Sequence, residues 1–304
     1  MAQLEPITLS ATASYFPSPA NVGLFDGKEG AVLIDTGNDA DSGRKLLKSL
    51  AGSRGLAAAV LTHSNADHAG GAAFIASRTG KPIYAARIEA ALCADPLLEP
   101  SFIWGAYPPA ELRGKFFMAP PCAVQPIPED GPLSAYPELE GLTPVPLGGH
   151  FFSQIGLLTD DGVLFAGDAL FGEASIRKHP VFFVYDVAAF LSSLDRILAL
   201  GPEVALPSHG DPVRGAAALV AANRAAVERV AESVLEACAE AASASGGASP
   251  DDVLASVCAS FSIDLDWAQY ALVGSTVRSY LVWLRNRGEL EVGFARGRMG
   301  WRRK

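Results

Sequence analysis

Short apolar runs separated by glycine and polar turns fill much of the N-terminal two thirds of the chain. Residues 7–37 predict a series of short strands with glycine turns, one of them at Asp26 and Gly27. Four further apolar runs predict strands at residues 56–61, 82–86, 163–166 and 203–206.

Helices are predicted between these strands, at residues 44–50, 69–79 and 187–200. The second helix has a stop signal in the sequence Gly80, Lys81, Pro82. The third is amphipathic and would cover a sheet. Its apolar positions are Phe190, Leu191, Leu194, Ile197 and Leu198.

The pattern changes after residue 215. An alanine-rich helix is predicted at 216–242, then a linker at 243–250, helices at 251–260, 266–272 and 275–287, and strands at 290–295 and 299–302. Helices followed by a β-hairpin are typical of a winged helix. We therefore predict a first domain at 1–215 and a helical, winged-helix-like domain at 216–304.

Residues 93–140 form an insert that is rich in proline and aromatic residues and shows little periodicity. Its aromatic cluster contains Phe102, Trp104, Tyr107 and Phe116. Long loops of this kind are often functional, so one interpretation is that the insert shapes a pocket for a small-molecule substrate with an apolar portion. An equal alternative is packed core structure or a homodimer contact.

Composition narrows the functional class. The chain has 304 residues, 49% of them hydrophobic, yet no apolar run approaches a membrane span, and no export signal is visible at the N-terminus. Four scattered cysteines are typical of reduced thiols. We therefore expect a cytoplasmic protein rather than a membrane protein or a secreted antibiotic-degrading enzyme.

The charge argues against nucleic acid as a partner. The net charge is −9, and although residues 285–304 carry a local excess of basic groups, the region from residue 251 onward is nearly neutral. A docking or dimerisation role is the better interpretation of the C-terminal domain.

The run LTHSNADHAGG at residues 61–71 is the most informative segment of the chain. It places His63, Asn65, Asp67 and His68 directly after an apolar strand. Imidazole and carboxylate groups are the natural ligands of zinc and iron at neutral pH. The two glycines that follow would let the backbone turn tightly into a helix.

Three further ligand candidates occur in similar settings downstream. His150 follows two glycines, while Asp168 and His209 each follow a short apolar strand. Ligands from several strand ends can converge on one rim of an α/β fold. The sequence therefore predicts one metal centre built from distant segments.

This ordered set of motifs resembles the metallo-β-lactamase-fold hydrolases over roughly residues 7–215. The family signature is His-x-His-x-Asp-His, then Gly-His, Gly-Asp and a final Gly-His or Ser-His, preceded by a strand that ends in Asp-Thr-Gly, here residues 35–37. The resemblance implies an α/β fold, a four-layer αββα sandwich. Asn65 departs from the signature, because it replaces the second histidine.

The resemblance also implies the ligand sets. The first metal site would be His63, Asn65 and His150, the second would be Asp67, His68 and His209, and Asp168 would bridge them. A carboxamide oxygen is a poorer donor than imidazole to a borderline cation. We therefore expect one tight zinc ion, with the second ion weak or absent.

Three enzyme classes follow. The leading one is a metal-dependent hydrolase in which a metal-activated water attacks an ester, thioester, lactone or amide, with Asp67 as ligand and orienter. The alternative is a mononuclear non-haem iron dioxygenase of the persulfide type, because His63, His150 and Asp168 form a two-His-one-carboxylate set. A nuclease is third.

Two further residues are candidates for proton transfer at this centre. His179 lies beside Lys178 shortly after the Asp168 strand, and Tyr185 follows in the same segment. Either side chain could instead be an ordinary surface residue.

Overall fold

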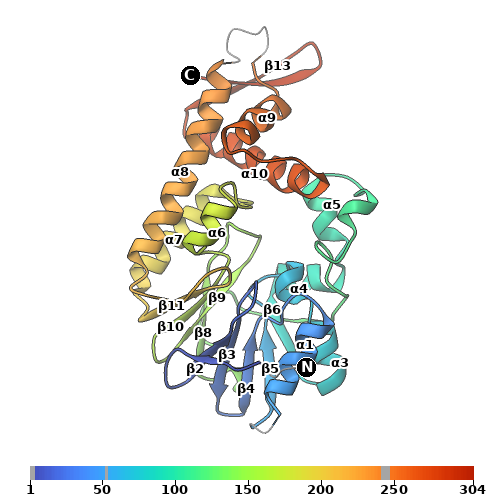
Figure 1. Cartoon of the computed structure of the whole chain (residues 1–304), viewed down its shortest axis with the longest axis vertical. Helices are drawn as coiled ribbons and strands as arrows, with labels where there is room; N and C mark the ends of the chain where they lie inside the picture. Colours follow the sequence, from blue (N-terminus) through green and yellow to red (C-terminus); the bar gives the residue numbers. More distant parts are fainter. Residues whose placement is uncertain (1–3, 52–53, 241–246) are drawn as a thin grey trace.

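The computed structural model describes residues 4–51, 54–240 and 247–304 (Figure 1). Part of the N-terminal stretch without an export signal, the last two residues of the predicted helix 216–242 and the first half of the predicted linker lie outside the described residues.

The described chain contains two large sheets that face each other. The first has the order β1-β2-β3-β4-β5-β6-β7, and its strands are parallel from β4 to β7. They are β1 (Ile7–Thr8), β2 (Ala13–Phe16), β3 (Val22–Gly27), β4 (Gly30–Ile34), β5 (Leu56–Val60), β6 (Ile83–Ala86) and β7 (Gln125–Ile127). The second has the order β12-β11-β10-β9-β8. Its strands are β8 (Leu142–Pro146), β9 (Ile155–Thr159), β10 (Val163–Gly167), β11 (Val204–Pro207) and β12 (Val213–Arg214).

Helices cover the outer faces of both sheets (Figure 1). Those on the first sheet are α1 (Ala40–Ser49), α2 (Ala66–Ala69), α3 (Ala72–Thr79) and α4 (Arg87–Ala94). Helix α5 (Leu98–Trp104) lies farther from that sheet, beside the C-terminal helices. The second sheet is covered by α6 (Glu173–Lys178), α7 (Val187–Leu200) and the long α8 (Ala217–Glu240). No helix in the described ranges is long and apolar enough to cross a membrane.

Side chains along each central strand alternate between two hydrophobic cores. In β4, Val32 and Ile34 point into the core between the sheets, whereas Ala31 and Leu33 pack against the helices of the first sheet. In β10, Phe165 lies between the sheets, and neighbouring residues face α7 and α8. Three core layers therefore separate four layers of structure, which confirms the predicted αββα sandwich.

The register of the parallel strands gathers the motif loops at one edge. Ile34 of β4 lies opposite Val60 of β5, so the segments after these two strands begin side by side. Gly167 of β10 lies opposite Pro207 of β11, with the same result in the second sheet. The carboxyl ends of parallel strands provide the ligand-bearing loops.

Helix α7 matches its predicted bounds because local signals define both of its ends. The Asp186 side chain caps the N-terminus by accepting a hydrogen bond from the Ala189 N–H, and Gly201 ends the helix with a positive φ of 57°. Phe190, Leu194 and Ile197 are buried against the second sheet, as their spacing predicted.

The C-terminal prediction needs one correction. The helices expected at 266–272 and 275–287 form one continuous helix, α10 (Trp267–Asn286), because Gly274 is accommodated within it. It follows α9 (Pro250–Ser260) and precedes the hairpin of β13 (Leu290–Ala295) and β14 (Arg298–Arg303). These elements share a hydrophobic core with α7 and α8. The winged-helix comparison and the boundary at residue 215 stay predictions.

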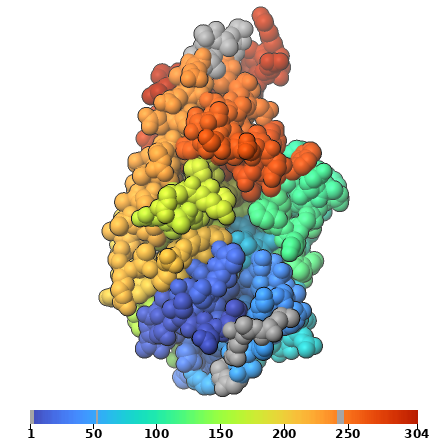
Figure 2. Space-filling view, viewed as in Figure 1, coloured from blue at the N-terminus to red at the C-terminus, as the bar shows by residue number. Residues whose placement is uncertain are grey.

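The insert is more regular than its sequence suggested. It contains α5, the short helices η1 (Ala110–Leu112) and η2 (Pro137–Leu139), and β7. Ile103, Leu112 and Phe117 pack against Ala271 of α10, so part of the insert is core that docks on the C-terminal helices. Figure 2 shows the green insert in contact with the orange C-terminal elements.

The two glycines after the motif do not form the tight turn that we expected. Gly70 and Gly71 have ordinary negative φ values, and they separate α2 from α3 where one helix was predicted. A Cβ on Gly70 would lie 2.2 Å from the backbone carbon of Asn38, and one on Gly71 would lie 2.2 Å from the Thr36 oxygen. The glycines therefore allow the loop after β4 to lie directly against the backbone that joins α2 to α3.

We predict that Gly71→Ala lowers the free energy of unfolding by about 1–3 kcal/mol, because a backbone oxygen must move to admit the methyl group. Urea unfolding of the variant measures this. Gly114→Ala is the matched control, since a Cβ there meets nothing within 4 Å. Equal stability of the two variants would contradict the close-approach explanation.

Candidate metal centre

The predicted ligands converge at one edge of the sandwich. Potential ligand atoms of His63, His150 and Asp168 all lie within 4.8 Å of one another. The same holds for a second group, Asp67, His68 and His209. The structure thus brings together side chains from segments that are far apart in the sequence, in the two groups that the resemblance implied.

Asp35, directly after β4, orients His68, the last histidine of the motif. Its carboxylate accepts a hydrogen bond from His68 Nδ1 at 2.8 Å and from the Thr62 backbone N–H at 2.8 Å. Asp35 is buried, with a positive φ of 66° that only a few non-glycine residues adopt. Backbone strain of this kind is concentrated at functional sites.

Asp35 also acts on His63, through Thr62. The Thr62 hydroxyl lies 3.0 Å from Asp35 Oδ2 and 3.0 Å from His63 Nδ1. Because a carboxylate can only accept, the hydroxyl donates to Asp35 and accepts from His63 Nδ1–H. The proton of the His63 ring is therefore on Nδ1, and its Nε2 carries a free lone pair.

Backbone carbonyls orient the other two histidines. His150 Nδ1 donates to the Phe183 oxygen at 2.9 Å, and His209 Nδ1 donates to the Pro19 oxygen at 2.7 Å. All four histidines therefore bind an outer partner through Nδ1 and direct Nε2 toward the shared centre. This is the usual arrangement of metal-ligating imidazoles.

The polar atoms that face the centre fit a metal ion. His63 Nε2, His68 Nε2 and Asp168 Oδ1 are buried and have no hydrogen-bond partner among the described residues. A buried polar atom without a partner is costly unless something else satisfies it. Asp168 lies between the two groups, with its oxygens 3.5 Å from His68 Nε2 and 3.3 Å from His209 Nε2.

Electrostatics divide the histidines into two classes. Burial lowers the pKa of His63 well below its ordinary value and also lowers the pKa of His150. Burial opposes charge on His68 and His209 too, but Asp67 raises the pKa of His68 to about 9 and Asp168 raises that of His209 to about 11. The two carboxylates thus make this edge favourable for positive charge.

Asn65 lies beside the first group. Its Oδ1 is 3.1 Å from His150 Nε2, and its Nδ2 donates to Glu99 Oε1 at 2.7 Å. Glu99 belongs to α5 and is buried. A second buried glutamate, Glu89 of α4, accepts hydrogen bonds from the backbone N–H groups of Ser64 and Ser153.

A pocket of about 650 Å³ opens onto this centre. Asp67, His150, Asp168 and His209 are at its floor. Its apolar wall includes Phe116, Phe171, Val181, Phe182, Leu272 and Val273. Residues of α10 and one aromatic residue of the insert therefore line the same pocket as four of the predicted metal ligands.

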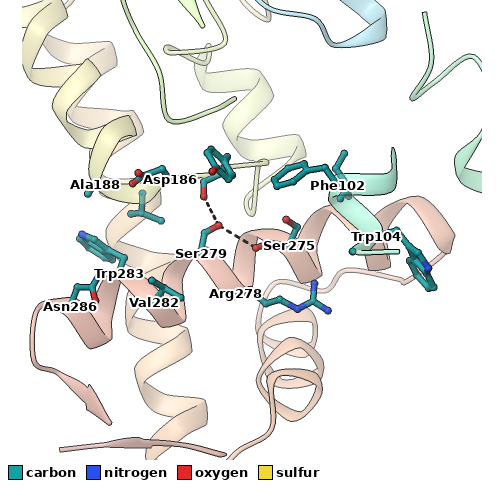
Figure 3. A pocket seen from close by; sticks show the side chains of 14 residues that line it. Phe102, Trp104, Asp186, Ala188, Ser275, Arg278, Ser279, Val282, Trp283 and Asn286 are labelled. Atoms are coloured by element: carbon teal, nitrogen blue, oxygen red, sulfur yellow. Dashed lines mark hydrogen bonds between the residues drawn. The ribbon is translucent and has the colours of Figure 1, made fainter. Parts of the chain in front are cut away.

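The two proton-transfer candidates, His179 and Tyr185, line different pockets. His179 and Lys178 line the pocket above the centre. Tyr185 lines a different pocket, between α5 and α10, together with Phe102, Trp104 and Ser279 (Figure 3). Its backbone N–H donates to the Gly149 and His150 oxygens. Tyr185 therefore supports the His150 loop through its backbone, and its candidacy for proton transfer stays a prediction.

The sequence interpretation missed Asp35, Thr62, Glu89 and Glu99 as supporting residues. Asp35 and Thr62 stood at the ends of predicted strands beside the motif, which was an available signal. The two glutamates carried no local signal, because each reaches the motif from a helix at least twenty residues away.

We predict that Asp35→Asn lowers the zinc affinity of the protein by about 10- to 100-fold, because one amide oxygen cannot accept all the hydrogen bonds of the carboxylate. Asparagine tolerates the left-handed backbone at this position, so the loop conformation is retained. Competition with a chromophoric chelator measures the affinity. Asp26→Asn, at an exposed residue of β3, is the control and should match the parent protein.

The comparisons with known proteins agree with this geometry. Residues 15–209 match the Metallo-beta-lactamase superfamily. YflN of Bacillus subtilis (strain 168), described as a probable metallo-hydrolase, is 28% identical over 188 residues. That alignment covers 53% of this chain and 66% of YflN, so the chain spans just under two thirds of that relative.

Two solved structures resemble the whole described fold. One is a beta-lactamase domain protein from Burkholderia ambifaria, with a TM-score of 0.71 at 20% identity, covering 99% of this chain and 94% of that one. The other is TTHA1429, a metallo-beta-lactamase family protein from Thermus thermophilus, with a TM-score of 0.69 at 20% identity, covering 99% and 98%. At this identity the likeness concerns the fold. The superfamily match, by contrast, covers more than half of the chain and contains the motif, Asp168 and His209, so the protein belongs to the metallo-beta-lactamase superfamily.

Proposed function

We propose that this protein is a metal-dependent hydrolase that cleaves an ester, thioester, lactone or amide bond in a small molecule. One observation carries the proposal: four imidazoles and the carboxylates of Asp67 and Asp168 converge in two adjacent groups, and each imidazole is fixed by a partner at Nδ1. His150, His209 and both carboxylates also line a pocket. Such a preorganised donor set is suited to divalent cations.

In this proposal His63, Asn65 and His150 would hold one ion, Asp67, His68 and His209 the other, and Asp168 would contact both. Bound zinc would supply a water nucleophile at neutral pH and polarise the scissile carbonyl. The side chain of Asp67 is about half exposed to the pocket, and its Oδ2 lies 3.3 Å from His209 Nε2. From there it can accept a hydrogen bond from the incoming water and orient it.

The pocket wall supports a substrate with an apolar portion. Phe116, Phe182 and Leu272 offer the surface on which that portion would pack. Lys178 and His179 lie on the same wall and offer hydrogen-bond donors to the polar part. A substrate of this kind would bury its apolar group and direct its carbonyl toward the floor.

The direct test combines metal analysis with a screen against ester, thioester, lactone and phosphodiester substrates. We expect Asp67→Ala and His68→Ala to abolish both hydrolysis and the tightly held metal, because each removes a ligand of the second group. His63→Ala should keep one metal and turn over slowly. If His63→Ala alone empties the protein of metal, the assignment of the tight site is inverted.

Metal stoichiometry tests the role of Asn65 separately. Dialysed protein should retain close to one zinc ion per chain, and Asn65→His should raise this toward two, because imidazole is the better donor to zinc. Elemental analysis after dialysis provides the count. If the parent protein retained two ions, the Asn65 carboxamide would not weaken metal binding in the first group.

An iron-dependent dioxygenase is the second candidate. It is favoured by one observation, the compact two-His-one-carboxylate group of His63, His150 and Asp168. If iron were the sole metal retained and turnover consumed oxygen, the dioxygenase function would be favoured over the hydrolase.

A further inference from the structure

Asn65 occupies the start of a helix without capping it. The residue precedes α2, a position where an asparagine side chain usually accepts a hydrogen bond from the first turn. No such bond is formed by Asn65. The side chain instead extends between Glu99 on one side and His150 on the other. Something other than helix capping therefore determines its conformation.

The two ends of the carboxamide are chemically different, so its orientation matters. With Nδ2 donating to Glu99, the oxygen faces His150 Nε2 at 3.1 Å. Because His150 donates its ring proton from Nδ1 to the Phe183 carbonyl, Nε2 of the neutral ring carries a lone pair. Two lone pairs then face each other at the separation expected of two ligands on one cation.

The reverse orientation would be unfavourable for a cation. A flipped amide would present its NH₂ group to His150 and would leave its own oxygen in contact with the carboxyl oxygen of Glu99. The two orientations have the same shape, so packing alone cannot choose between them. A hydrogen-bond acceptor beside the amide can select one orientation, and Glu99 Oε1 is that acceptor, 2.7 Å from Asn65 Nδ2.

We infer that Glu99 is a positioning residue that directs the Asn65 carboxamide oxygen into the first ligand group and thereby makes Asn65 a metal ligand. The inference rests on the proposed metal-dependent function. Glu99 is buried at the start of α5, so the orientation is fixed by the insert. An acceptor oxygen is present in either protonation state of Glu99, but only the carboxylate, which has no proton to donate, excludes the flipped amide.

The consequence is a first group of two imidazoles and two oxygens in place of three imidazoles and one oxygen. Oxygen donors favour harder cations, so this group would bind its ion more weakly than zinc sites rich in histidine. Glu99 therefore affects the affinity for the second equivalent of metal, while the group of Asp67, His68 and His209 holds the first.

The test is a zinc titration of the metal-free full-length protein, followed by calorimetry, with Co²⁺ absorption as a spectroscopic readout. We expect two binding steps in the parent protein. Glu99→Met, which keeps the length of the side chain but removes the acceptor, should weaken the second step by about 10-fold or more and leave the first step unchanged. Glu99→Gln, the matched control, keeps an acceptor oxygen but adds an NH₂ donor that can pair with a flipped amide, so it should weaken the second step less than Glu99→Met does.

Two further variants keep the inference testable if Glu99→Met does not fold. In the Asn65→Ala background, changing Glu99 should alter the second step by less than about twofold, because no amide remains to be oriented. The combined variant Asn65→Asp with Glu99→Gln exchanges donor and acceptor, and it should bind the second zinc ion at least as tightly as the parent.

The outcomes separate the two proposals. Parent protein that binds no zinc and hydrolyses no substrate contradicts the proposed function. Parent protein that takes up a single zinc ion at saturation, or a second step that is equal in the parent and Glu99→Met, overturns the role of Glu99 alone. Equal weakening in Glu99→Met and Glu99→Gln would also overturn it, because an acceptor oxygen at this position would then make no difference.

Discussion

The buried carboxylate of Asp35 is the constraint on which the rest of the centre depends. It accepts hydrogen bonds from the Thr62 backbone, the Thr62 hydroxyl and His68, and it does so from a left-handed backbone conformation. A single group thus joins the end of β4, the end of β5 and the motif helix. Because hydrogen bonds to a charged group are strong, this junction can offset the strain of its own backbone. The parallel pairing of β4 and β5 brings the three partners within reach.

Around that junction the fold tolerates features that would destabilise an ordinary core. Ligand atoms of His63, His68 and Asp168 are buried without hydrogen-bond partners in the described chain. Gly70 and Gly71 admit a backbone contact that no other residue would allow. Natural proteins accept such costs at functional sites and compensate for them elsewhere. Here the compensation comes from three hydrophobic layers whose strands alternate between cores.

Local signals explain which parts could be predicted from the sequence. Helix α7 was predicted at its observed bounds because its cap, its periodicity and its final glycine are all local. The ligand candidates were found because the motif is contiguous and the others follow strands or glycines. The sequence could not reveal Glu89 or Glu99, since their partners are selected by tertiary packing. It also divided α10 in two, because Gly274 and Ser275 suggested a break that burial of the flanking Val273 and Val277 prevents.

The C-terminal region contributes residues both to the candidate site and to the hydrophobic core. Leu272 and Val273 of α10 line the pocket that also contains four of the predicted metal ligands, while Ala271 on the same helix packs against the insert. The insert in turn carries Glu99, which contacts Asn65. A substrate that displaces α10 would therefore disturb the residues around Asn65 through one chain of packed contacts. Since packed cores resist continuous deformation, the pocket shape and the geometry around Asn65 are mechanically linked.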